Sequence, residues 1–130
     1  MVINDIKGDS TKTFDLDKPI YANKENVKII PEKYNLSNAY PNPFNPSTTI
    51  EYALPRQSAV TVDIYNIIGQ KVTDFCLVSQ SSGTHTLKWN GKNRYGNKAA
   101  SGLYIIRFHA KSLEGKAEIF QKTIKAIMLK

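Results

Sequence analysis

The chain has 130 residues, of which 41% are hydrophobic and 22% charged, and its formal net charge at neutral pH is +7. This length allows one domain with a packed core and is too short for two, and no apolar run approaches the roughly 18 residues that a membrane-spanning helix needs. The single cysteine, Cys76, excludes an internal disulfide. Its apolar neighbours predict that it is buried as a small hydrophobic residue.

Residues 1–34 are predicted to be a linker or the remnant of an upstream region. They contain six lysines and six acidic residues, with only short apolar patches between them. The first ten residues lack the basic, then apolar, then small-residue order of a secretory signal, which leaves a cytoplasmic protein or a piece of a longer precursor. Residues 35–130 hold twelve Lys or Arg against five acidic residues, so the predicted domain carries the whole net charge.

Three prolines within six residues mark the point at which the regular pattern begins. Pro41, Pro43 and Pro46 fix φ and lack a backbone donor, so neither a helix nor a central strand runs through them. Residues 49–54 then alternate between apolar and polar side chains, which is typical of a half-buried strand. We expect the prolines to form a rigid, extended corner between linker and domain.

The later strands are predicted from the same alternation. The segments that show it are residues 59–65, 71–78, 84–89, 103–110 and 117–129. The first two form a hairpin whose turn contains Gly69. Trp89 is expected at the centre of the core, because its indole is large enough to fill the space between two sheets. Residues 90–102 form a long connection rich in glycine and asparagine.

These elements predict an all-β fold. About seven short strands, with turn signals every 8 to 15 residues and no helical apolar spacing beyond one turn, favour an antiparallel β-sandwich of immunoglobulin-like type. We assign the sandwich to residues 35–130, preceded by the N-terminal linker.

Enzymatic activity is not expected. His85 and His109 lie on different predicted strands without an acid placed to orient either, so both are interpreted as surface residues. The chain contains no nucleophile elbow, zinc-protease motif, paired-cysteine motif or glycine-rich phosphate loop. The sequence therefore predicts no catalytic residues and no cofactor.

A metal site and a nucleic-acid site are also not expected. Asn90, Asn93 and Asn97 have a spacing that suits oxygen-rich turns around hard cations, but neutral amides beside Lys92 and Arg94 predict turn caps instead. The pI of about 9.5 meets the first criterion for a nucleic-acid-binding protein. The basic residues are scattered, however, without a stacking platform, and they favour a solvated face that contacts anionic surface polysaccharide or a partner protein.

Five segments in order resemble the C-terminal sorting domain of type IX secretion cargo. They are YPNPFNPSTTIEYALP (residues 40–55), VDIYNIIGQKV (62–72), GTHTLKWNGKNRYGN (83–97), ASGLYIIRF (100–108) and KAIMLK (125–130). Their I-Y-N-x-x-G and W-x-G-x-x-x-x-G elements are also similar to the immunoglobulin-like domain of flagellar hook-capping proteins. The proline-rich start and the K-x-x-x-L-K end favour the sorting domain. Asn90 and Asn93 depart from the family pattern, in which an aspartate is frequent.

The resemblance implies an address label on a longer secreted precursor of a Bacteroidetes-type bacterium. The implied partners are the outer-membrane translocon of the type IX system and its shuttle and attachment proteins, with contact to anionic lipopolysaccharide, and the implied location is the cell surface or the medium. By motif, the residues implied in recognition are Gly102, Tyr104, Lys125, Leu129 and Lys130. Each also has a structural interpretation: a turn for the glycine, the core for the tyrosine and solubility for the lysines.

The docking mode and two other functions complete the expectations. We expect the last strand to be exposed and to receive a receptor by strand addition at an open sheet edge. The alternative is a structural sandwich module of a surface enzyme or a self-assembling filament subunit, which would form polymers where a label stays monomeric. Polysaccharide binding would need exposed aromatic side chains on one face, and the candidates are Tyr65, Tyr95 and Phe44.

Overall fold

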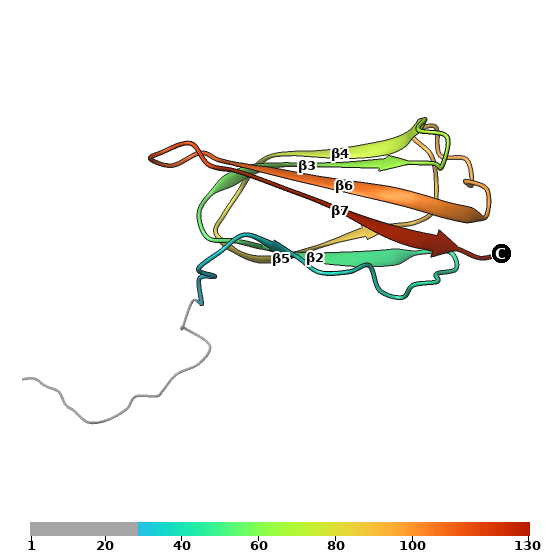
Figure 1. The fold of residues 1–130 in the computed structure, drawn as a ribbon, viewed down its shortest axis with the longest axis horizontal. Helices are drawn as coiled ribbons and strands as arrows, with labels where there is room; N and C mark the ends of the chain where they lie inside the picture. The colour runs from blue at the N-terminus through green and yellow to red at the C-terminus, as the bar shows by residue number, and fades with distance from the viewer. Residues whose placement is uncertain (1–28) are drawn as a thin grey trace, which may run out of the picture.

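Seven strands form two antiparallel sheets in the computed structural model, which describes residues 29–130 (Figure 1). The strands are β1 (Asn35–Leu36), β2 (Thr48–Leu54), β3 (Ser58–Tyr65), β4 (Lys71–Gln80), β5 (Gly83–Trp89), β6 (Gly102–Ser112) and β7 (Ile119–Met128). One sheet has the order β1-β2-β5 and the other the order β4-β3-β6-β7. The predicted immunoglobulin-like sandwich is confirmed. Within the described residues, no helix is long and apolar enough to cross a membrane.

The core lies between the sheets because alternate residues of β2, β3 and β6 are apolar and point inward. Their buried side chains are Ile50, Tyr52, Leu54, Val60, Val62, Ile64, Tyr104, Ile106, Phe108 and Ala110. The two sheets meet through aromatic contacts, such as that between Tyr52 and Phe108, whose ring centroids are 5.0 Å apart. Burial of each large apolar side chain contributes about 1.5–3 kcal/mol, so these three strands hold the sandwich together.

Cys76 is exposed, and the prediction that it is buried is wrong. It lies on β4, the edge strand of the four-stranded sheet, where Phe75 and Leu77 pack against the core. Because successive side chains of a strand point to opposite faces, the residue between these two points to solvent. An apolar run at a sheet edge does not reveal which of its residues face inward.

Packing in the sandwich starts at Tyr34, the last residue of the predicted linker. Its side chain is buried, its ring stacks on Phe120 with centroids 5.8 Å apart, and its hydroxyl shares a hydrogen bond of 2.8 Å with Ser58 Oγ. Residues 1–28, the rest of the predicted linker, lie outside the described residues. The division into linker and domain stays a prediction.

The two ends of the sandwich carry different connections (Figure 1). What we call the loop end comprises residues 41–47, the β3–β4 turn at 66–70, the loop at 90–101 and residues 129–130. The opposite end, here the far end, comprises residues 29–34, 55–57, 81–82 and 113–118. The described chain therefore enters the sandwich at one end and finishes at the other.

Candidate functional site

Between β1 and β2 the chain crosses from one sheet to the other. It first follows β2, and the backbones of Tyr40 and Thr49 exchange two hydrogen bonds of 2.9 Å. It then reaches β7, where Phe44 N donates to Ile127 O at 2.8 Å and Phe44 O accepts from Leu129 N at 2.9 Å. The peptide bonds before the three prolines are cis. The crossing ties the final strand to the start of the domain.

The Asn42 side chain occupies backbone positions along the same edge of β7. Its Nδ2 donates to Lys125 O at 3.1 Å, and its Oδ1 accepts from Ile127 N at 2.9 Å. Together with Phe44, it pairs with Lys125 O, Ile127 N, Ile127 O and Leu129 N, which strand addition at this part of β7 would need. The expectation of an open edge is therefore wrong for the last residues of β7, whereas along Ile119–Ile124 its outer edge pairs with no further strand of the described residues.

Phe44 and Trp89 anchor this crossing in the core. Phe44 is 1% exposed and Trp89 is 3% exposed, with ring centroids 5.5 Å apart. The Trp89 ring also meets the edge of Tyr104 at 5.1 Å, and its Nε1 donates to Lys92 O at 2.9 Å. Trp89 lies in the core as predicted. Phe44 is buried, so the polysaccharide hypothesis loses one of its three aromatic side chains.

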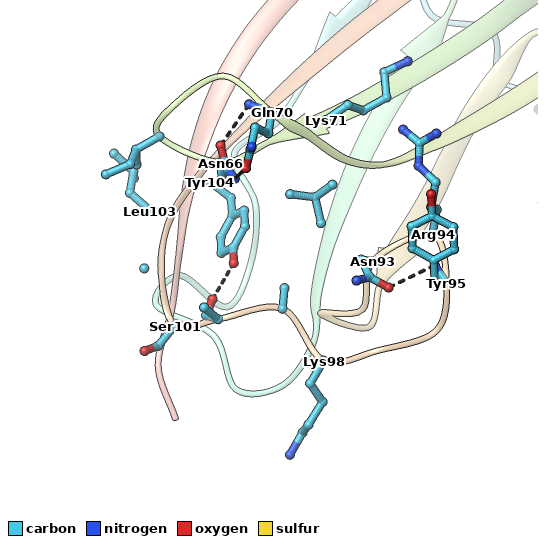
Figure 2. Close-up of a pocket in the computed structure, with 15 residues that line it drawn as sticks. Asn66, Gln70, Lys71, Asn93, Arg94, Tyr95, Lys98, Ser101, Leu103 and Tyr104 are labelled. Carbon is cyan, nitrogen blue, oxygen red and sulfur yellow. Dashed lines mark hydrogen bonds between the residues drawn. The ribbon is translucent and has the colours of Figure 1, made fainter.

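A cavity of about 630 Å³ opens at the loop end between the β3–β4 turn, the loop at 90–101 and the start of β6 (Figure 2). Asparagine side chains fix the backbone of the turn and the loop that line it. Asn66 Oδ1 accepts from the amides of Ile68 and Gln70, and Asn93 Oδ1 accepts from those of Tyr95 and Asn97. The prediction that asparagines of the long loop cap turns is confirmed for Asn93, and Asn90 does the same for Lys92 N.

Three cations and no carboxylate line this cavity. Lys71 lies 3.4 Å from Asp63 and 3.3 Å from Asp74, and its pKa is raised above the ordinary value mainly by the hydrogen bond to Asp74. Arg94 and Lys98 form no ion pair with any residue of the described range 29–130. Figure 2 shows their charged ends at the rim, directed away from the centre of the cavity. The loop end is therefore electropositive.

Four of the five residues predicted to act in recognition meet at this end. Gly102 and Tyr104 line the first cavity, while Leu129 and Lys130 line a second one of about 500 Å³. Lys98 and Ala99 line both. The fifth, Lys125, lies further along β7, opposite Ile105 of β6 and exposed on the outer face of the sheet.

Tyr104 and Gly102 each have a structural task. The Tyr104 hydroxyl donates to Ala100 O, four residues upstream, which is the arrangement of the tyrosine corner in immunoglobulin-like sandwiches. Gly102 begins β6 with a φ of 149°, where a side chain would be strained. Their recognition roles stay a prediction. Asn42, Arg94 and Lys98 were missed as site residues, because only the fold brings them to this end.

Gly91 lines the second cavity, and a side chain at this position is expected to be destabilising because Pro46 and Met128 lie close to it. Its φ is +77°, and a Cβ there would lie 2.5 Å from Pro46 O and 3.1 Å from Met128 Cε. Left-handed backbone costs an alanine about 1–2 kcal/mol, and the clash adds to this. Gly91→Ala should therefore lower the free energy of unfolding by more than about 2 kcal/mol in urea denaturation.

Gly96 provides the matched control for that substitution. Its φ is +86° and nothing lies within 4 Å of its Cβ position, so Gly96→Ala carries the backbone strain without the clash. Equal losses in the two variants would show that the contact between Gly91 and Pro46 contributes nothing.

Stability is expected to fall as the pH rises above about 10. Burial raises the pKa values of Tyr52 and Tyr104 above 10.0, so the folded chain keeps protons that the unfolded chain has lost. A group whose pKa is raised on folding stabilises the folded chain at pH values below its pKa in the unfolded chain. This stabilisation is lost as the pH rises through its pKa in the folded chain. The urea midpoint should drop as the pH rises from about 10 to about 11, and by less in Tyr52→Phe; an equal drop in that variant would contradict the assignment.

Comparison with known proteins gives one family and several similar folds. The sequence profile of the FlgD Ig-like domain matches residues 44–114. Dimeric latent PorU from Porphyromonas gingivalis has a TM-score of 0.54 at 24% identity, covering 70% of this chain and 9% of PorU. FlgD from Xanthomonas campestris has a TM-score of 0.53 at 19% identity, and the match covers 71% of this chain and 68% of that FlgD. FlgD from P. aeruginosa has a TM-score of 0.47 at 28% identity, and the match covers 62% of this chain and 61% of that FlgD. No curated protein matches. The chain thus spans a small part of PorU, and PorU and the X. campestris FlgD share its fold.

Proposed function

Because the chain belongs to the family of FlgD Ig-like domains, we propose that it is a non-enzymatic recognition module, and specifically a C-terminal sorting domain that directs a cargo protein through the type IX secretion system. Family membership accounts for the sandwich. The five sequence segments, with the proline-rich start and the K-x-x-x-L-K end, favour the sorting role within it.

The observation that carries this proposal is the convergence of the motif residues at the loop end. Gly102 and Tyr104 come from one motif and line the first cavity, while Leu129 and Lys130 come from another and line the adjoining second cavity. Residues 29–34 lie at the far end of the sandwich (Figure 1). A receptor that binds the loop end therefore meets the domain at the end opposite to residues 29–34, which suits a label that serves different cargoes.

The proposed partners follow from this role. They are the outer-membrane translocon and its shuttle and attachment proteins, and the cargo is delivered to the cell surface or the medium. Residues 35–130 carry the whole net charge of +7, which also suits contact with anionic lipopolysaccharide.

The test is export of a reporter. The full chain is fused behind a periplasm-directed reporter in a host with a type IX system and in the same host lacking the translocon. We expect the reporter outside the cell only when the translocon is present. Retention in the periplasm of both hosts, with the fusion folded, would contradict the proposal.

Truncation of the terminus is unsuitable for mapping recognition in this assay. Removal of residues 125–130 would take buried Ala126 and Met128 out of the core and break the backbone bond of Leu129 to Phe44. Such a variant loses stability whether or not the terminus is recognised. Substitutions confined to exposed side chains, such as Lys125→Gln and Lys130→Gln, separate the two effects.

A second candidate function is a structural module of an extracellular assembly. The family match favours this structural role, because FlgD from X. campestris acts in hook capping, which is essential for flagellar assembly. Within the described residues, the outer edges of β4 and β5 pair with no further strand, and Val78 on β4 is 77% exposed. Unpaired edges are templates for association. Polymers in sedimentation velocity would favour this function over a monomeric label.

A further inference from the structure

We propose that the two cavities of the loop end form one groove that binds an extended acidic peptide segment of a partner protein. The inference deepens the proposed sorting role and rests on it for its biological meaning, since it names the chemistry of the partner at that site. The groove consists of the linings of both cavities, joined through Lys98 and Ala99, which belong to each.

Charge indicates an anionic partner. The groove is lined by the cations Lys71, Lys92, Arg94, Lys98 and Lys130, and no Asp or Glu lines either cavity. Lys71 is paired with Asp63 and Asp74. The remaining cations form no ion pair with a described residue. Clustered charge of one sign raises the local concentration of an oppositely charged partner.

The placement of these charges favours an extended ligand over a small ion. In Figure 2, Lys71 and Arg94 lie to one side of the first cavity and Lys98 to another, and their charged ends point away from its centre. A small anion at the centre would not meet them. An extended peptide that crosses the rim of the first cavity and continues into the second would pass first Lys71 and Arg94 and then Lys98.

The apolar part of the groove favours a peptide over a nucleic acid or a glycan. Ile67, 68% exposed, and Leu103 line the first cavity, and Met128 and Leu129 line the second. Successive side chains of an extended peptide point to opposite sides. In a peptide of alternating acidic and apolar residues, the acidic side chains can therefore pair with the cations while the apolar side chains contact the apolar lining. Tyr95 is the single exposed aromatic residue lining the groove, whereas stacking recognition uses several.

Backbone hydrogen bonds of the chain itself hold the groove in shape. Arg94 N donates to Val72 O at 3.0 Å, Ala99 N donates to Gly91 O at 2.8 Å, and Lys92 and Lys98 form a β-bridge. These bonds hold the backbone of the loop at 90–101 against the sheets. A preformed site loses less conformational freedom on binding, which favours affinity.

The experiment is an NMR titration of the full ¹⁵N-labelled chain with the blocked peptide Asp-Leu-Asp-Leu-Asp-Leu, and with its Lys-Leu counterpart as the opposite-charge probe. Amide shifts are expected at residues 92–102 and 128–130 with the acidic peptide only. Arg94→Gln combined with Lys98→Gln should weaken binding about fivefold to tenfold. Lys111→Gln combined with Lys116→Gln, an equal loss of charge towards the far end, should leave it within about twofold.

Several results would overturn the inference. These are equal weakening by both double variants, equal binding of the Lys-Leu peptide, shifts spread over the far end, or preferential binding of a sulfated oligosaccharide or single-stranded DNA. The failure of the proposed function is distinguishable. If the acidic peptide binds the groove but Arg94→Gln with Lys98→Gln leaves reporter export unchanged, the groove stands and its role in sorting fails.

Discussion

Replacement of Trp89 by alanine is expected to lower the free energy of unfolding by about 3–5 kcal/mol. Trp89 is 3% exposed and joins Phe44 of the crossing segment to Tyr104 of β6 through ring contacts of 5.5 and 5.1 Å. Its loss opens a cavity beneath the loop end and removes the indole donor from Lys92 O. Urea denaturation followed by circular dichroism measures the change.

Tyr95 is the control for this substitution. It is also an aromatic residue of the loop end, but its side chain is 80% exposed. Tyr95→Ala should change the free energy of unfolding by no more than about 0.5 kcal/mol. A Trp89→Ala variant as stable as Tyr95→Ala would contradict the position of Trp89 in the core.

Replacement of Phe44 by alanine is expected to have an effect of similar size, about 3–5 kcal/mol, with a distinct local signature. Phe44 is 1% exposed, and its backbone holds β7 through Ile127 O and Leu129 N. Without the anchoring ring, the crossing should separate from β7 before the sandwich unfolds. Hydrogen exchange should therefore accelerate most at the amides of Ile127 and Leu129.

Tyr40 gives the matched control within the same crossing. Its ring is 79% exposed, while its backbone bonds to Thr49 are independent of the side chain. Tyr40→Ala should leave exchange at Ile127 and Leu129 unchanged. Uniform acceleration across all strands in Phe44→Ala, without a local maximum on β7, would show that the crossing is not a separate unit.

The sandwich could be predicted because strand alternation is local. In β2, β3 and β6 the apolar side chains recur at every second residue, and burial follows that spacing. Cys76 shows the limit of this reasoning. Its segment, Phe75–Cys76–Leu77–Val78, is apolar on both faces, and the position of β4 at a sheet edge decides which residues are buried.

The candidate site was less predictable because it is assembled by contacts between distant residues. Asn42 bonds to Lys125 and Ile127, which are 83 and 85 residues away, and no periodicity in the sequence records such a pairing. The prolines beside Asn42 predicted a rigid corner. The structure adds that this corner covers the edge of the final strand only at residues 125–129, next to the cavities of the loop end, where we place the proposed recognition surface.

We propose that the export machinery recognises the loop end of an intact sandwich. The most direct measurement is reporter export with two variants of equal charge and stability, Arg94→Gln combined with Lys98→Gln at the loop end and Lys111→Gln combined with Lys116→Gln towards the far end. Matching urea midpoints must first show that both fold like the parent chain. We expect export to fall only in the loop-end variant, and equal export by both variants would show that the loop end is not the recognised surface.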